Sequence, residues 1–235
     1  MTRINKVMSV SRTGEVSAIA ITAINEYTKN DWSFDANLTR IFNLLKQKSA
    51  ELTAAIDKGK AMSDLEAKDA VRDTKVRGLG FMLKGYLATS ENVALAAAEI
   101  VYNIFERCGI EVVNESYAIE TARIQSLLND LSSADIQAEI AKLPGIATLV
   151  ADLAAAETAF ENAKTNYDNA VAMEGKIASA SVLRSEVLQI LNEQVVVYLR
   201  AMLINGEATY DELASTIART INASNEIVRK RRNSS

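Results

Sequence analysis

Residues 63–89 decide the fold class and read SDLEAKDAVRDTKVRGLGFMLKGYLAT. Ser63 and Glu66 form an S-x-x-E capping box, in which each side chain accepts a hydrogen bond from a backbone N–H of the first helical turn. Apolar residues then recur three and four positions apart, at Leu65, Val76, Leu79, Leu83 and Tyr86. This pattern predicts a helix about 40 Å long, at a rise of about 1.5 Å per residue.

The rest of the chain has the composition of a helical protein. One proline and nine glycines in 235 residues are too few turn formers for a protein of many strands, whereas good helix formers are abundant. Periodic stretches and breaks predict further helices at residues 16–27, 35–59, 94–108, 114–131, 132–143, 146–173 and 179–205, and from 209 onward. We therefore expect an all-α, long-helix antiparallel bundle, a single domain over residues 1–235, with no β-sheet.

Two stretches of the chain share one spacing and suggest an internal repeat. The first reads Arg72, Val76, Leu79, Leu83, Tyr86 and Leu87, and the second reads Arg184, Leu188, Leu191, Val195, Tyr198 and Leu199. Two related three-helix units, 35–109 and 146–231, with a hinge near Pro144 explain the match. Chance is the alternative, because heptad spacing is common to most bundle helices.

The composition excludes most kinds of catalytic site. With no histidine, and with Cys108 as the single cysteine, the chain offers no Ser-His-Asp triad, no two-histidine metal site and no internal disulfide. Phosphate-binding glycine motifs are also missing. An all-carboxylate magnesium or manganese site stays open, but the acidic residues show no convergent motif. We expect a protein that is not an enzyme and has no cofactor.

Charge, cysteine content and hydropathy indicate the cellular compartment and the class of partner. A formal net charge of −4 does not suggest a general polyanion binder. A single cysteine is compatible with a reducing compartment, and no uninterrupted apolar stretch approaches the length of a membrane span. We expect a cytoplasmic protein without a membrane partner.

Arg72 has the most unusual placement, because it falls within the leucine stripe of its helix and must be paired or solvated there. We group it with charged residues that border other apolar stripes as a candidate polar core or ligand site: Asp69, Arg72, Glu120, Glu157 and Arg184. The favoured interpretation is buried ion pairs that fix helix register. The alternative is a polar pocket for an anion or small ligand. We expect Arg72 to be mostly buried, with a carboxylate or a main-chain oxygen in reach; Asp69, Glu120 and Glu157 are the side-chain candidates.

The opposite face of the same helix contains two glycines one heptad apart. Because glycine destabilises a helix interior by about 1 kcal/mol, its use predicts close approach of another helix. The face consists of Val71, Thr74, Gly78, Phe81 and Gly85. It is either covered within the chain or forms a homo-oligomer interface.

One basic cluster lies near the C-terminus: Arg229, Lys230, Arg231 and Arg232. The favoured interpretation is a helix end whose cations complement the helix dipole. Nucleic-acid contact is the alternative, although no second basic stripe and no interleaved aromatic residues support it.

Three short motifs give the chain a resemblance to a known group of sequences. They are Asp69-x-x-Arg72-Asp73, the preceding helix end at 52–58 and Tyr117-x-x-Glu120. From about Leu38 onward the chain resembles an uncharacterised family of bacterial all-helical proteins. The resemblance implies an all-helical fold and a bacterial cytoplasmic setting, and it implies no activity, substrate or cofactor.

The function favoured by these observations is a non-catalytic helical interaction or scaffold protein whose partner is another protein or itself. The first alternative is a nucleic-acid-associated accessory protein that uses the basic C-terminal cluster. The second is a bundle that binds a small ligand, an anion or a carboxylate-held metal around Arg72 and Asp69.

Overall fold

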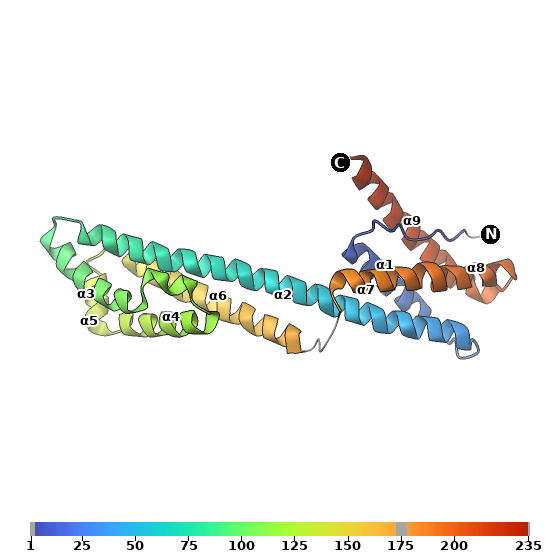
Figure 1. Ribbon diagram of the computed structural model, residues 1–235, viewed down its shortest axis with the longest axis horizontal. Helices are drawn as coiled ribbons and strands as arrows, with labels where there is room; N and C mark the ends of the chain where they lie inside the picture. The colour runs from blue at the N-terminus through green and yellow to red at the C-terminus, as the bar shows by residue number, and fades with distance from the viewer. Residues whose placement is uncertain (1–2, 173–177, 235) are drawn as a thin grey trace. The chain divides into compact units, whose positions relative to one another are not determined.

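The structure is a computed structural model that describes residues 3–172 and 178–234. Within these residues every regular element is helical and no strand occurs, so the all-α prediction is confirmed (Figure 1). The α-helices are α1 (Thr13–Tyr27), α2 (Ala36–Leu87), α3 (Asn92–Cys108), α4 (Tyr117–Leu131), α5 (Ala134–Ile140), α6 (Ile146–Ala172), α7 (Ala180–Gln189), α8 (Val196–Ile204) and α9 (Asp211–Asn233). Short helical turns connect some of them: η1 (Ile110–Asn114), the π-helical η2 (Ile190–Val195) and η3 (Ala208–Tyr210).

The chain divides into two compact units. Unit 1 comprises residues 1–60 and 170–235, and unit 2 comprises residues 61–169. The ranges 35–109 and 146–231, proposed as a repeat, each contain residues of both units. The duplication and the single-domain organisation stay predictions.

The predicted break between residues 59 and 63 is wrong, because α2 is one helix of 52 residues. Gly59 lies inside it in open surroundings, and no atom of the described residues lies within 4 Å of the position of a Cβ atom. Ser63 and Glu66 are therefore interior helical residues and not a capping box. One glycine destabilises a helix by only about 1 kcal/mol, which packing along the rest of α2 offsets.

Asp35 determines where α2 begins. Its Oδ1 atom accepts hydrogen bonds from the backbone N–H groups of Asn37 and Leu38, at 3.1 and 2.9 Å. The hydroxyl groups of Tyr198 and Tyr210 donate to the same carboxylate, at 2.8 Å and 2.7 Å to Oδ2. These bonds hold the pKa of Asp35 below its usual value despite the opposing effect of burial.

Unit 1 has a core built by α1, the first part of α2, the continuous helix α7–η2–α8, and α9. By length and composition the stretch Ala180–Ile204 is apolar enough to cross a bilayer, with a mean hydropathy of 1.4 in its best window. It was not anticipated from the sequence, because polar residues interrupt its apolar ones. Leu183, Val187 and Leu199 from this stretch are buried in the core of unit 1, so the stretch packs there as a core helix.

Side chains of unit 1 hold the N-terminal segment, residues 3–12, by its main chain. Asn192 both accepts from the N–H of Val7 and donates to its carbonyl, at 2.7 and 3.0 Å. Asn225 donates to the carbonyl of Lys6 and accepts from the N–H of Met8, at 2.9 and 3.0 Å. The segment thus has hydrogen-bond partners without forming a strand.

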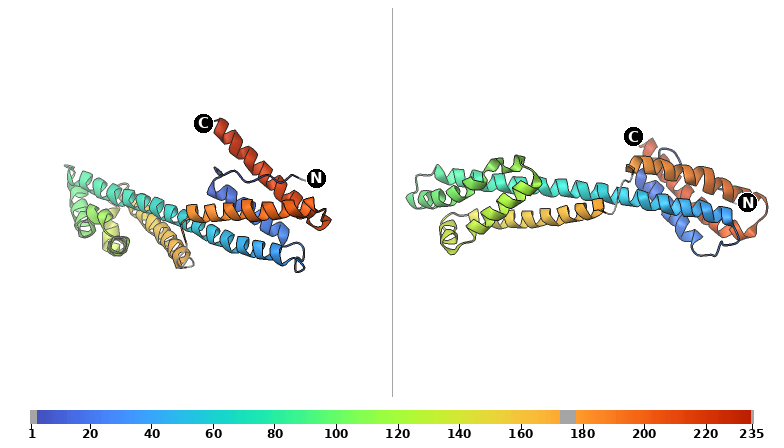
Figure 2. Two further views of the ribbon diagram at one scale, coloured as in Figure 1. Left: turned by 45° about the vertical axis from the view of Figure 1, so that its right-hand side comes forward. Right: turned by 60° about the horizontal axis from the view of Figure 1, so that its bottom comes forward.

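Unit 2 packs α3, α4, α5 and α6 beside the second part of α2. Two further views show α6 alongside α2 (Figure 2), and the pair Lys75–Asp152 at 2.7 Å joins the two helices. The Pro144–Gly145 turn precedes α6 and packs on α2, since the Tyr86 hydroxyl donates to the Pro144 carbonyl at 2.8 Å. Hinge motion at this turn stays a prediction.

Candidate functional site

The interior of unit 2 contains a charged cluster centred on Arg72 of α2. The side chain of Arg72 has no solvent exposure, so the prediction that it is buried beside a carboxylate is confirmed. One guanidinium nitrogen, Nη2, donates to Oδ1 of Asp69 at 2.8 Å and to Oε2 of Glu120 at 2.5 Å. The other, Nη1, donates to Oε2 of Glu157 at 3.2 Å and to the Thr121 hydroxyl at 3.0 Å.

Three helices supply these side chains. Asp69 lies one helical turn before Arg72 on α2, Glu120 lies in the first turn of α4, and Glu157 lies on α6. The ring of Phe160 covers one face of the guanidinium, with Cζ of Arg72 3.5 Å from the ring centroid. The contacts of the cluster thus connect α2, α4 and α6 of unit 2 at one level along their length.

Burial dominates the electrostatics of the acidic groups. It raises the pKa of Glu120 to about 7, against the lowering effect of Arg72, and the nearby carboxylates of Asp73 and Asp69 raise it further. Burial also raises the pKa values of Glu157 and Asp69, again against Arg72. The guanidinium therefore does not offset the cost of burying so many carboxylates together.

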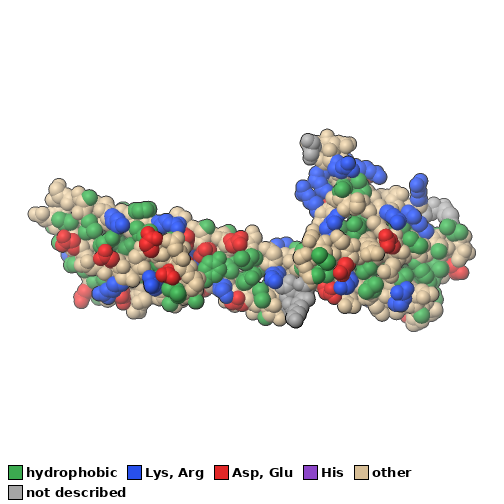
Figure 3. Space-filling model, viewed as in Figure 1, with side chains coloured by type: hydrophobic (Ala, Val, Ile, Leu, Met, Phe, Trp, Pro, Cys, Tyr) green, Lys and Arg blue, Asp and Glu red, His purple; other side chains and the backbone are tan. Residues whose placement is uncertain are grey.

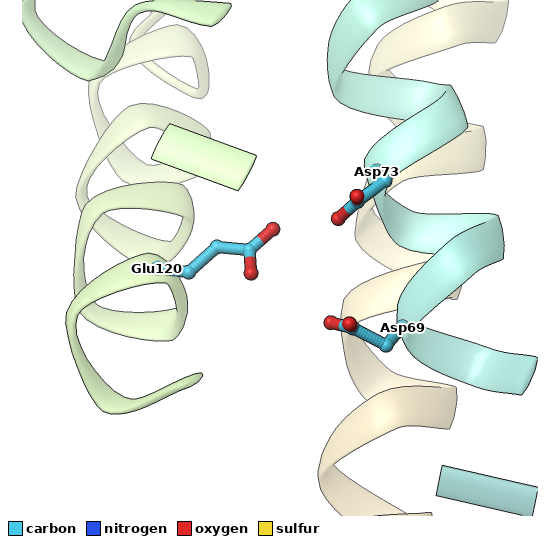
Figure 4. A group of neighbouring side chains, drawn as sticks. All are labelled: Asp69, Asp73 and Glu120. Carbon is cyan, nitrogen blue, oxygen red and sulfur yellow. The ribbon is translucent and has the colours of Figure 1, made fainter. Parts of the chain in front are cut away.

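Asp69, Asp73 and Glu120 form the acidic side of the cluster. One carboxylate oxygen of each lies within 4.8 Å of the other two, and Figure 4 shows the Glu120 carboxylate directed across the space between α4 and α2 towards the two aspartates. Buried oxygens Oε1 of Glu120 and Oδ1 of Asp73 have no hydrogen-bond partner among the described residues. Oδ2 of Asp73 contacts Nη2 of Arg77 at 3.3 Å.

The structure brings together four of the five residues predicted for the polar core site. Arg184 is not among them, because it lies in α7 of unit 1 and donates to main-chain carbonyls of Ser11, at 2.6 Å, and Ser9. Its helical spacing matches that of Arg72, but spacing within one helix does not reveal which chain segment faces it.

Sequence reasoning missed three members of the cluster. Asp73 was signalled by its place one turn after Asp69 and beside Arg72. Thr121 and Phe160 gave no separate signal, because a threonine next to a glutamate and a phenylalanine on an apolar stripe are ordinary features of a helix.

A shallow groove of about 340 Å³ lies beside the cluster, between α4 and α6. Thr121 and Phe160, both in contact with Arg72, belong to its lining. Arg72 itself does not line the groove. An anion in this groove thus has no direct access to the guanidinium, which weakens the anion-pocket interpretation.

The face predicted for helix packing is uncovered within unit 2. Val71, Thr74, Phe81 and Gly85 are exposed, with 62% of Phe81 accessible to solvent. Among the described residues, a Cβ atom on Gly78 would contact Leu149 alone, at 4.0 Å, and one on Gly85 would have no neighbour within 4 Å. The close approach expected at these glycines within the chain is wrong; it occurs instead at Gly80, where a Cβ atom would lie 2.7 Å from the Phe105 ring.

The basic C-terminal cluster lies at the end of α9, where Lys and Arg side chains gather on the surface (Figure 3). Arg231 is partly buried and binds the carboxylate of Glu15 on α1. Arg229, Lys230 and Arg232 are exposed. One of the four cations therefore has a structural contact, and the nucleic-acid role of the cluster stays a prediction.

Comparison with known proteins gives a family and no activity. Residues 62–222 match the family described as "Family of unknown function (DUF6261)". No curated protein and no solved structure matches the chain.

Proposed function

Because the chain belongs to the DUF6261 family of unknown function, we propose its role from geometry: a non-catalytic helical interaction protein that pairs with a second copy of itself. The observation that supports this is the uncovered face of α2, defined by Val71, Thr74, Gly78, Phe81 and Gly85 and called here the pairing face. Its residues alternate three and four positions apart, which is the spacing of a helix–helix seam. It lies within the residues that match the family.

The order of large and small residues along the pairing face favours a second copy as the partner. In an antiparallel pair centred on Gly78, Val71 of one chain lies at the level of Gly85 of the other, seven residues on either side of the centre. Phe81 lies at the level of residue 75, one residue along the helix from Thr74, so its ring packs beside Thr74. Large side chains thus meet small ones, and each side of a two-fold interface uses the same residues.

The apolar gain comes from two exposed side chains of the pairing face. Phe81 is 62% exposed and Val71 is 49% exposed. Complete burial of such a side chain contributes about 1.5–3 kcal/mol, and two-fold symmetry counts each residue twice. The glycines allow the helix axes to approach to the short end of the usual range, about 8 Å.

Light scattering coupled to size-exclusion chromatography tests the proposal on the wild type and on Phe81→Asp. We expect the wild type at twice the chain mass of 25.5 kDa. Phe81→Asp is expected at a single chain mass with an unchanged helical circular dichroism spectrum, because the ring has few contacts in its own chain to lose. The matched control is Val93→Asp, which changes an equally exposed residue, 63% accessible, outside the pairing face.

Three results contradict the proposal. One is a wild type that stays at a single chain mass up to its solubility limit. A second is a wild-type pair that Phe81→Asp leaves intact, which would place the interface elsewhere. Loss of the pair in Val93→Asp as well as in Phe81→Asp would also count against the pairing face, because the effect would then be one of added charge.

The nucleic-acid alternative has less support in the arrangement of the basic residues, since Arg231 is engaged by Glu15. The bacterial and cytoplasmic setting stays a prediction.

A further inference from the structure

The carboxylates around Arg72 outnumber the cations that contact them. Among the described residues, the carboxyl groups of Asp69, Asp73, Glu120 and Glu157 face two guanidinium groups, those of Arg72 and Arg77. When all four carboxyl groups are ionised, two negative charges have no counter-charge. Glu120 and Glu157 are almost fully buried, so water compensates little of this excess. Two protons or one divalent cation would neutralise it.

The unpartnered buried oxygen of Glu120 indicates where a cation would lie. Glu120 is 1% exposed, and its Oε2 atom is engaged by Arg72 while Oε1 has no donor in reach among the described residues. In Figure 4 this carboxylate is directed towards Asp69 and Asp73. Asp73 has a second buried oxygen without a hydrogen-bond partner among the described residues, Oδ1. A buried oxygen without a hydrogen-bond partner is unfavourable, so one ligand that contacts both oxygens is stabilising.

We propose that Asp69, Asp73 and Glu120 bind a divalent cation that prefers oxygen ligands, such as Mg²⁺, Mn²⁺ or Ca²⁺. Each contributes one carboxylate oxygen, and the three lie within 4.8 Å of one another, so small side-chain movements bring them around one ion. The set contains no nitrogen or sulfur ligand, which disfavours zinc and copper.

Arg72 is a positioning residue for this site. Its Nη2 atom binds one oxygen of Asp69 and one of Glu120, and this orients the remaining oxygens of both carboxylates. Arg77 acts on Asp73 in the same way through Oδ2. The ion therefore shares its carboxylates with two guanidinium groups.

The aspartates give the ion a route to solvent. Their side chains are 24% and 16% exposed for Asp69 and Asp73, whereas that of Glu120 is 2% exposed. Magnesium and manganese retain several waters when proteins bind them through few carboxylates. Three carboxylates on one side with solvent on the other suit such a partly hydrated ion.

Manganese is the probe for the test, because its binding is followed directly by electron paramagnetic resonance and by calorimetry. The full chain is freed of metal with a chelator, dialysed and titrated with Mn²⁺ at neutral pH. We expect saturable binding of one Mn²⁺ per chain, competition by Mg²⁺ or Ca²⁺, and a Tm that rises with Mn²⁺ concentration. Asp73→Asn should weaken binding at least tenfold, because the neutral amide loses the charge of one ligand.

The control is Asp152→Asn, which removes a half-exposed carboxylate of the same unit that pairs with Lys75. It should bind Mn²⁺ as the wild type does. Glu120→Gln is the second ligand variant, and Asp73→Asn keeps the test decisive if that substitution prevents folding. A wild type without saturable Mn²⁺ binding overturns the proposal and leaves protons as the neutralising species. Equal binding by the wild type and Asp73→Asn overturns it as well.

Discussion

Replacement of Arg72 by methionine is the most informative perturbation of the unit 2 core. Methionine has a similar length and no charge, so packing is largely kept while four hydrogen bonds, to Asp69, Glu120, Glu157 and Thr121, are lost. Removing one partner of a buried ion pair destabilises a protein by about 3–5 kcal/mol, because the other charge remains buried without compensation. We expect a loss in this range at pH 8, and a smaller loss at pH 5, where the carboxyl groups are more readily protonated.

Urea denaturation followed by circular dichroism measures the effect, with Glu157→Gln and the double variant completing a thermodynamic cycle. The coupling free energy between Arg72 and Glu157 should lie at about 0.5–3 kcal/mol. Arg107→Met is the matched control, since Arg107 is 73% exposed and its contact with Asp130 belongs to the surface class. A loss below about 1 kcal/mol for Arg72→Met, or a coupling near zero, would refute the view that this cluster stabilises the helix arrangement.

Three further outcomes follow from individual contacts. Gly59→Ala should raise the free energy of unfolding by about 0.5–1 kcal/mol, because alanine favours the helix and its Cβ atom enters open space. A Tm below that of the wild type would indicate that α2 is interrupted at residue 59. Tyr198→Phe removes a hydrogen-bond donor to Asp35, whose pKa in the folded protein lies below its usual value of 3.8. The ionised Asp35 therefore stabilises the fold above pH 3.8, and this stability is lost as the pH falls through the folded-state pKa. With one donor fewer, acid unfolding should begin at a higher pH, and an unchanged acid transition speaks against this. Asn192→Leu should speed hydrogen exchange at the N–H of Val7, and protection equal to the wild type would mean that this side chain does not hold the segment.

The sequence was sufficient for the fold class and for the position of Arg72. A single charge within a leucine stripe has few ways to be accommodated, so its burial beside carboxylates followed from helical geometry. The sequence did not predict in the same way which helices pack against one another. The residues around Glu120 and Glu157 give no sign that these two side chains face α2. Arg184 has the same helical spacing as Arg72 but lies in the other unit, so spacing alone did not identify the members of the cluster.

The length of α2 was missed because local signals were given too much weight. Gly59, Ser63 and Glu66 are common at helix ends, but each is also tolerated inside a helix whose flanks are packed. The glycines of the pairing face led to a second wrong prediction, that of a close helix contact within the chain. Gly80 packs closely against Phe105 within the chain, and it lies two residues from Gly78, on a different side of the helix.

Disulfide cross-linking of Gly78→Cys tests the pairing face most directly. In an antiparallel pair centred on this position the two introduced thiols face each other, and the side chain fits because only Leu149, at 4.0 Å, is near. Cys108 interferes little, since it is buried and burial raises the pKa of its thiol to about 11. Mild oxidation should convert Gly78→Cys to a disulfide-linked pair much faster than the control Val93→Cys. Equal rates for the two variants, or no cross-link at residue 78, would contradict the account.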